Sequence, residues 1–197
     1  MVGAPLRSSS QDAKPDSATV PRTVDLGVSK RALREIHQRV REHFGEDWPS
    51  ATTTDMVMEY VKPLTKSRHC RLTELPGYLD ESEIGRPTYF ISHAWKAPAE
   101  LLFRRVDEFL GDADDSTRVW VDCFAVNQHG DDAVGHGHQQ NKEDVGAFED
   151  VVVASEGGTM VVVDIRFNPA TRGWCIYEWC VARRPVRLRR IARKIRR

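Results

Sequence analysis

No apolar run in this sequence is long enough to cross a membrane, and its 197 residues carry no net charge. The longest apolar stretches, such as residues 159–163, are far shorter than the roughly 20 residues that a membrane-spanning helix needs. The N-terminus lacks the apolar core segment of a secretory signal, so we expect none there. Cysteines are scarce and follow no disulfide-framework spacing, which predicts a reducing, cytoplasmic location. They are Cys70, Cys123, Cys175 and Cys180.

Common nucleotide-binding and nucleophile motifs are absent as well. The sequence contains no G-x-x-x-x-G-K-[ST], no G-x-G-x-x-G and no G-x-S-x-G. The first two motifs cradle phosphates at a helix N-terminus, and the third presents a nucleophilic serine. Their absence disfavours phosphoryl transfer and Rossmann-type hydride transfer.

The zero net charge conceals a strongly basic C-terminus. Nine of the 29 basic residues and none of the 29 acidic residues lie in positions 179–197, so the rest of the chain has a net charge of −9. We expect the tail, residues 183–197, to bind an anionic partner or to fold back on the acidic body. Nucleic acid, an anionic membrane surface and calmodulin-like proteins all suit this tail, and a nuclear-localisation signal is an alternative.

The N-terminal part of the chain divides into two segments. Residues 1–25 are rich in Ser, Pro, Ala and Asp and have no hydrophobic period, so we expect them to be disordered. Residues 26–86 are expected to form a helical lead-in. Its first helix is predicted over 29–44, with Ser29 as the N-cap and Gly45 as the stop.

Two shorter helices are predicted further along the lead-in. One runs over 54–62, where Thr54 or Asp55 serves as the cap and Pro63 ends the helix. The other lies near residues 72–75 and precedes a Pro-Gly turn.

From residue 87 to residue 182 the pattern alternates between short apolar strands and amphipathic helices. Strands are predicted over 88–92, 118–122 and 159–164, helices over 100–110, 142–155 and 171–182, and a polar loop over 129–141. This alternation predicts an α/β fold with a parallel sheet and helices on both faces. In a doubly wound order the third strand lies beside the first and leaves a bare apolar edge. We therefore expect a chain truncated after the third helix, or an edge covered by the basic tail, the N-terminal helices or a partner.

Ligands bind such sheets at the carboxyl ends of the strands. The polar and aromatic residues at these ends are Ser92, His93, Trp95, Asp122, Cys123, Asn127, Gln128 and the segment 164–168. Because the three loops converge, we expect a shared site there. The structural alternative is that Ser92 and Asp122 cap turns and that Trp95 and Trp120 belong to the core.

Metal binding is the weaker interpretation of the histidines and cysteines. His136 and His138 lie in a Gly-rich loop, where solvent exposure explains them, and Cys175 and Cys180 are too far apart for a zinc knuckle. His93, Cys123 and His129 are expected near the same end of the sheet. We expect no metal site.

Three ordered blocks carry a family resemblance. They are YFISHAW at residues 89–95, VWVD at 119–122 with Asn127-Gln128, and RGWCIYE at 172–178. Together they resemble Toll/interleukin-1 receptor (TIR) domains, whose third helix opens with a Trp-Cys-x-x-Glu motif. The second block is also similar to heterokaryon-incompatibility domains, and residues 48–75 look like the lead-in of a TIR-like subgroup of algae and other microbes.

The resemblance implies a flavodoxin-like, TIR-like fold over residues 87–182 and a specific chemistry. Many TIR domains hydrolyse NAD⁺ at the nicotinamide–ribose bond with one glutamate, which by position is Glu178. NAD⁺ would be the substrate, and no cofactor is implied. Ser92, His93 and Asp122 are then expected to contact the nucleotide, with Trp95 or Trp174 stacked on a ring.

The resemblance also supports a role without catalysis. Many TIR domains are adaptor modules that self-associate or bind other TIR-like domains in intracellular signalling or defence. The bare sheet edge predicted above is consistent with that alternative.

Overall fold

The computed structural model describes residues 22–131 and 136–164. The predicted helix over 171–182, the basic tail and most of the N-terminal segment lie outside these ranges. Residues 22–25, which we assigned to the disordered tail, are part of the fold: Thr23–Asp25 forms a 3₁₀ turn whose Thr23 is buried. Trp120 Nε1 donates to the Thr23 carbonyl at 2.9 Å, which ties this turn to the core.

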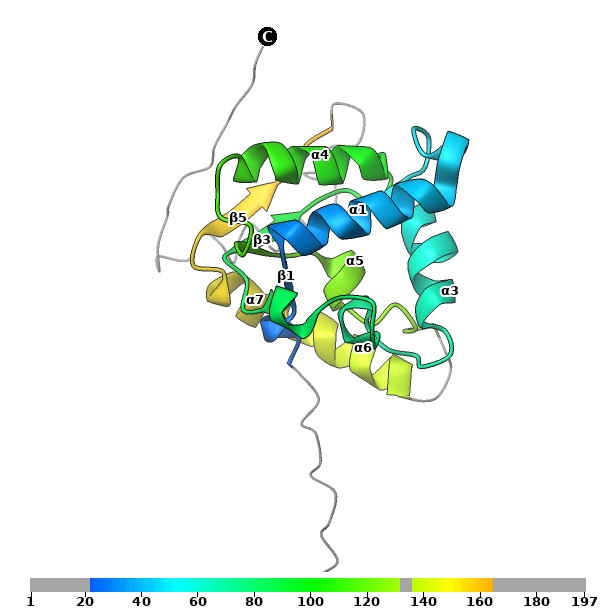
Figure 1. Ribbon diagram of the computed structural model, residues 1–197. Coiled ribbons are helices and arrows are strands. Elements are labelled where there is room, and N and C mark those ends of the chain that lie inside the picture. The colour runs from blue at the N-terminus through cyan, green and yellow to red at the C-terminus, as the bar shows by residue number, and fades with distance from the viewer. Residues whose placement is uncertain (1–21, 132–135, 165–197) are drawn as a thin grey trace, which may run out of the picture.

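The described residues form a mixed α/β fold around a five-stranded sheet (Figure 1). Its strands, in the spatial order β2-β1-β4-β3-β5, are β1 (Gly27–Ser29), β2 (Ile84–Gly85), β3 (Tyr89–Ser92), β4 (Arg118–Trp120) and β5 (Gly158–Val161). β3 pairs in parallel with both β4 and β5, as predicted for the three strands after residue 87. β1 is antiparallel to β4 and to β2, so the whole sheet is mixed.

The strands β1 and β2 were not predicted, because segments of three and two residues are too short to show a period. Their pairing depends on a close backbone approach at Gly27. A Cβ atom there would lie 2.9 Å from the Gly85 carbonyl oxygen and 2.9 Å from Pro87 Cβ. Only glycine therefore allows β1 to lie beside β2 in this register.

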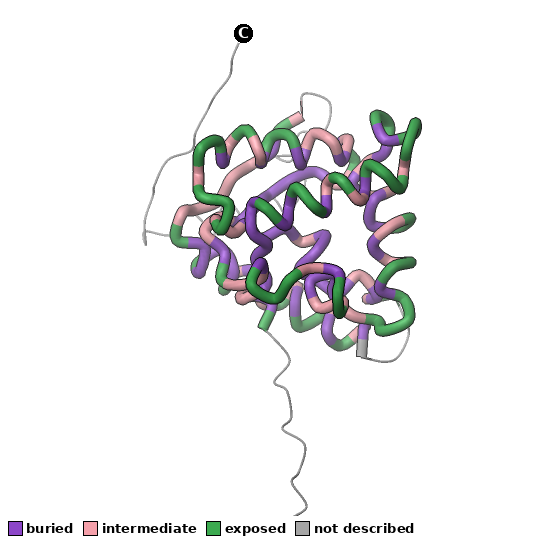
Figure 2. The backbone as a smooth tube through the Cα atoms, viewed as in Figure 1, coloured by how far each residue is buried: buried purple, intermediate pink, exposed green. Residues whose placement is uncertain are grey.

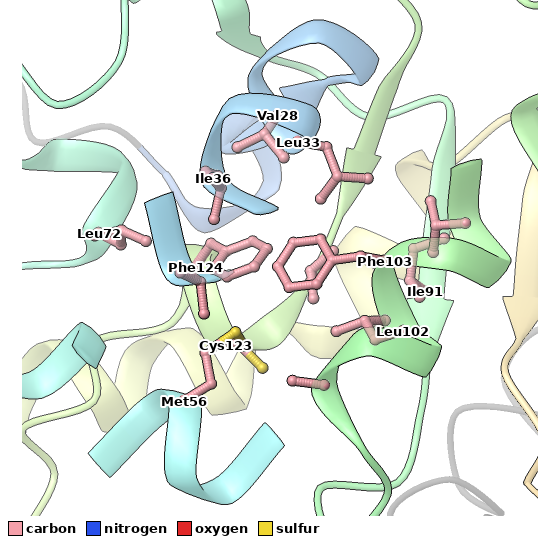
Figure 3. Packing of buried hydrophobic residues seen from close by; sticks show 14 of the residues in the cluster. Val28, Leu33, Ile36, Met56, Leu72, Ile91, Leu102, Phe103, Cys123 and Phe124 are labelled. Carbon is pink, nitrogen blue, oxygen red and sulfur yellow. The ribbon is translucent and has the colours of Figure 1, made fainter. Parts of the chain in front are cut away.

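The helices α1 (Lys30–Phe44) and α4 (Ala99–Leu110) cover one face of the sheet (Figures 1 and 2). Both confirm the predicted helices to within a residue. Their buried side chains pack with Ile91 of β3 and Val119 of β4 in one cluster (Figure 3). Within it, the rings of Phe103 and Phe124 lie 6.1 Å apart.

The helix α7 (Phe148–Ala154) covers the opposite face. Phe90 of β3 stacks on Trp120 of β4 with ring centroids 5.2 Å apart, and Phe148 meets Trp120 edge-on at 5.2 Å. Helices on both faces agree with the predicted architecture. They also bury both sides of β3 and β4, which explains the consecutive apolar residues Phe90-Ile91 and Val119-Trp120.

Two boundary predictions in this region were wrong. The helix predicted over 142–155 is two helices, α6 (His136–Gly146) and α7, and α6 begins inside the predicted polar loop over 129–141. The polar composition of α6 hides its helical period. Its buried residues Gln140 and Asp144 bond to other segments of the chain, so tertiary contacts support this helix in place of an apolar face.

The second predicted helix also differs from the structure. It consists of α2 (Thr53–Asp55), a π-helical turn (η3, Met56–Val61) and α3 (Lys62–Thr65). The N-cap is Thr52, which forms a capping box with Asp55. Neither of the two predicted N-cap candidates, Thr54 and Asp55, is therefore the cap. Pro63 does not end the helix. The wider π-helical turn before it accommodates the proline ring, and proline has no N–H that would need a backbone acceptor.

The remaining short elements connect these layers. α5 (Asp122–Ala125) follows β4 directly, and 3₁₀ turns occur at η2 (Gly45–Asp47), η4 (Leu72–Glu74) and η5 (Glu81–Glu83). The turn at 72–74 corresponds to the short helix predicted there. Within the described ranges, no helix is both long enough and apolar enough to cross a membrane.

Ser29 joins the end of β1 to the start of α1. Its hydroxyl oxygen accepts the Ala32 N–H at 3.0 Å, which confirms the predicted N-cap, and the same hydroxyl donates to Glu83. Arg31 donates to the other carboxylate oxygen of Glu83. The Ser29 hydroxyl and Arg31 lower the pKa of the Glu83 carboxyl, against the opposing effect of burial.

Replacing Ser29 should therefore destabilise the fold more than the loss of an ordinary N-cap would. Ser29→Ala leaves the Ala32 N–H uncapped and removes a donor from buried Glu83, so we expect unfolding to become easier by about 1–2 kcal/mol. Urea denaturation followed by circular dichroism measures this loss. Ser67→Ala, at an exposed turn, is the matched control and should stay within about 0.5 kcal/mol of the parent. Equal losses in the two variants would contradict the capping role.

The lowered pKa of Glu83 predicts a pH dependence. Stability from this carboxylate is present above the ordinary glutamate pKa of about 4.3 and is lost as the pH falls through the lower folded-state pKa. Glu83→Gln should show a weaker loss of stability on acidification than the parent chain. The test compares urea midpoints of the two proteins between about pH 6 and pH 3, and parallel curves would argue against this linkage.

Candidate functional site

Four side chains meet where β3 and β4 end, and we call them the edge cluster: His93, Trp95, Asp122 and Cys123. His93 and Trp95 follow β3, and Asp122 and Cys123 open α5 directly after β4. Since the two strands are parallel neighbours, their carboxyl ends lie at the same edge of the sheet. The parallel pairing therefore brings together residues that are about 30 positions apart in the sequence.

The edge cluster is connected by short polar contacts. Trp95 Nε1 donates to Asp122 Oδ2 at 2.8 Å. The Cys123 thiol donates to Asp122 Oδ1 at 3.3 Å, and its Sγ lies 3.5 Å from His93 Nε2. His93 Nε2 is 3.7 Å from Asp122 Oδ1. Asp122 thus uses one carboxylate oxygen toward Trp95 and the other toward His93 and Cys123.

Burial divides the edge cluster into two sides. Cys123 is completely buried and His93 is 5% exposed, whereas the Asp122 side chain is 23% exposed and Trp95 is half-buried. Cys123 lies beside Phe124 among the core residues (Figure 3). A full-sized substrate therefore has access to Asp122 and Trp95 but not to the thiol, which disfavours Cys123 as a nucleophile.

The structure brings together several of the predicted site residues. Ser92, His93, Trp95 and Asp122 lie at one edge of the sheet, as expected for the loops after the first two of the three predicted strands. Ser92 is buried, and within the described residues its hydroxyl has no hydrogen-bond partner.

Other predicted site residues cannot be placed with them. Glu178 and Trp174 lie outside the described residues, as do Cys175 and Cys180. Asp164 is the last residue of the described range, so most of the segment 164–168 lies outside it too.

A second group of polar residues, the buried network, surrounds an ion pair between Arg71 and Asp144. Arg71 Nε donates to Asp144 Oδ2 at 2.9 Å, and Arg71 Nη1 donates to Glu74 Oε1 at 2.6 Å. The backbone N–H of Asn127 donates to Asp144 Oδ2 at 2.9 Å. Burial raises the pKa of the Asp144 carboxyl, against the opposing effect of Arg71 and this N–H. The network joins the lead-in, the segment after β4 and α6.

Asn127 belongs to this network, and Gln128 beside it donates to backbone carbonyl oxygens. Asn127 Nδ2 donates to the His69 carbonyl at 2.6 Å and to Gln140 Oε1 at 2.6 Å. Gln128 Nε2 donates to the carbonyl oxygens of Asp122 and Val126 at 3.0 and 3.1 Å. Both amides therefore hold the backbone of the segment after β4 in place, which is a positioning role.

Two of the histidines that we weighed as metal ligands also have structural contacts. His129 Nε2 lies 2.9 Å from Thr65 Oγ1, and its ring centroid is 4.7 Å from that of His69. His138 Nδ1 lies 2.6 Å from the Gly130 carbonyl oxygen. Gly137 allows α6 to lie close to His129, because a Cβ atom at residue 137 would be 2.9 Å from His129 Cβ.

The ion pair between Arg71 and Asp144 was not predicted. The two residues are 73 positions apart, and neither stands in a recognisable motif. The sequence of α6 is polar and shows no apolar face, which is consistent with such a network but does not identify its partners. Comparisons of the chain with protein-family models, with curated proteins and with solved structures found no match.

The buried network predicts a large loss of stability when one of its charged side chains is replaced by a neutral one of the same size. Asp144→Asn keeps the side-chain size but removes the more deeply buried of two carboxylates that bind Arg71, the other being Glu74, so we expect a loss of about 3 kcal/mol in unfolding free energy. Urea denaturation measures it. Asp150→Asn, at an exposed position of α7, is the matched control and should change stability by less than about 0.5 kcal/mol. A loss at Asp144 as small as the control's would show that the ion pair contributes little.

Proposed function

We propose that this chain is a TIR-like signalling module that hydrolyses NAD⁺ at the nicotinamide–ribose bond. The observation that supports this proposal is the bond from Trp95 Nε1 to Asp122 Oδ2, at the carboxyl edge of two parallel strands. Ligands of open α/β sheets bind at that edge. The sequence resemblance adds the chemistry, through the Trp-Cys-x-x-Glu motif that ends at Glu178.

The exposed side of the edge cluster suits a flat heterocycle next to a ribose. The bond to Asp122 fixes the indole of Trp95 while part of its surface remains open, so the ring is available for stacking on the nicotinamide or the adenine. The partly exposed Asp122 carboxylate can accept ribose hydroxyl groups. Ser92 and His93 are buried, so in this proposal they shape the floor of the site.

Glu178 supplies the reacting carboxylate in this proposal. The bond between ribose C1′ and the nicotinamide nitrogen breaks, and its electron pair returns to the ring, which leaves as a neutral molecule without a general acid. The ribose passes through an oxocarbenium-like state that a nearby carboxylate stabilises. Water then adds to C1′, and the products are nicotinamide, ADP-ribose and one proton.

A self-associating adaptor is the second candidate. Two exposed apolar side chains favour it: Val153 on α7 and Val163 just after β5, which are 65% and 56% exposed. Among the described residues, β5 pairs with β3 alone, so its other edge has no strand partner there. An edge without a strand partner is suited to association with another copy.

Nicotinamide release from NAD⁺ tests the proposed activity. The purified full chain should release nicotinamide, and Glu178→Ala should lower the rate at least about 100-fold if this carboxylate stabilises the transition state. Trp95→Phe keeps a ring but loses the bond to Asp122, and it should chiefly raise KM for NAD⁺. Chromatographic separation of nicotinamide and ADP-ribose gives the rates.

Glu156→Ala, at an exposed glutamate between α7 and β5, is the matched control and should keep the parent rate. Release that persists in Glu178→Ala would refute the assignment of this carboxylate. No release by the parent chain, together with concentration-dependent oligomers in light scattering, would favour the adaptor role.

A further inference from the structure

Three different metal-binding side chains converge in the inner half of the edge cluster. His93 offers an imidazole nitrogen, Asp122 a carboxylate oxygen and Cys123 a sulfur, and these atoms lie within 4.8 Å of one another. The residues come from two separate segments, one after β3 and one after β4. Two of them, His93 and Cys123, are buried, so the group is not a chance collection of surface charges.

The triangle of donor atoms has the dimensions of one face of a tetrahedral site. Its edges are 3.5 Å from His93 Nε2 to Cys123 Sγ, 3.3 Å from Cys123 Sγ to Asp122 Oδ1 and 3.7 Å from His93 Nε2 to Asp122 Oδ1. Zn–N, Zn–O and Zn–S bonds of ordinary length at tetrahedral angles give edges of about 3.4–3.6 Å. An ion above the centre of this triangle can therefore reach bonding distance from all three atoms after small side-chain adjustments.

The donor types select among metals. Mg²⁺ and Ca²⁺ prefer sites made entirely of oxygen ligands, whereas a thiolate with an imidazole suits Zn²⁺. The surroundings fit as well. Trp95 donates to the Asp122 oxygen that does not face the triangle, which is the orienting contact that metal-bound carboxylates usually have. The partial exposure of Asp122 provides a path for the ion to enter.

We propose that His93, Asp122 and Cys123 bind one zinc ion, which connects the segment after β3 to the start of α5. The Cys123 thiol gives up its proton to become the ligand, and a water molecule or a further side chain completes the tetrahedron. This site connects the ends of two strands, and it does not depend on the proposed NAD⁺ hydrolysis. We expected no metal site from the sequence, where His93 and Cys123 were weighed together with His129, whose Nε2 lies beside Thr65 Oγ1 in the structure.

Cobalt substitution tests the site, because Co²⁺ takes the place of Zn²⁺ and has visible absorption. The full chain, stripped of metal with a chelator, is titrated with Co²⁺ under reducing conditions. We expect one equivalent to produce a near-ultraviolet thiolate-to-cobalt charge-transfer band and the intense visible bands of tetrahedral cobalt. One equivalent of Zn²⁺ should then displace the cobalt and raise the melting temperature of the chain.

Variants assign the signal to the three ligands. Cys123→Ser should abolish the charge-transfer band, whereas the matched control Cys70→Ser should keep it, since Cys70 is a partly exposed thiol that is not among the three grouped donors. Asp122→Asn should weaken zinc binding. Trp95→Phe, which removes only the orienting bond, should weaken zinc binding about tenfold in competition with a chromophoric chelator.

Two results would overturn the proposal. One is a parent chain that gives no charge-transfer band with Co²⁺. The other is a band that persists in Cys123→Ser, which would place the thiolate ligand elsewhere in the chain. Circular dichroism checks that each variant is folded. If buried Cys123 does not tolerate serine, Asp122→Asn, at a partly exposed position, decides the matter: unchanged zinc affinity in that variant refutes the site.

Discussion

The parallel pairing of β3 with β4 is the constraint on which the rest of the structure depends. It places Phe90 against Trp120 on one face of the sheet and directs Ile91 and Val119 to the other, so both faces need helices to cover them. It also brings two strand ends to the same edge, where the polar residues that follow them must meet. A slip of one residue in this register would exchange the faces of every side chain on the strand and separate His93 from Asp122.

The buried network fixes the segment that follows the edge cluster. Arg71 and Asp144 lose their hydration on folding, and an ion pair seldom repays this cost by itself. Its geometry nevertheless restricts the fold, because Asp144 also accepts the Asn127 N–H and thereby holds the segment that leaves the edge cluster. We infer that the network mainly selects one arrangement of the lead-in, the segment after β4 and α6. It adds less to the net free energy of folding.

Asp122 connects the two proposed roles of the edge cluster. One oxygen faces Trp95 and the partly open side, where a nucleotide would bind, and the other faces His93 and the buried thiol, where a zinc ion would bind. An ion on the inner side would fix the carboxylate and, through it, the indole. The two proposals are tested by different readouts, nicotinamide release and cobalt absorption, but in the molecule they share Asp122 and Trp95. A site positioned by buried contacts on strand ends is more rigid than one carried by a loop alone.

The sequence by itself determined the elements with a strong period. Apolar residues at three- and four-residue steps marked α1 and α4, Ser29 marked a helix start, and short apolar runs marked β3, β4 and β5, because local periodicity reports which face is buried. It also indicated that Ser92, His93, Trp95 and Asp122 would lie at one edge, since strand ends of a parallel sheet share an edge. Only the tertiary structure decided the antiparallel strands β1 and β2, the helix α6, the passage of a helix through Pro63 and the ion pair of Arg71 with Asp144. These features depend on partners far away in the chain, and no local pattern records such partners.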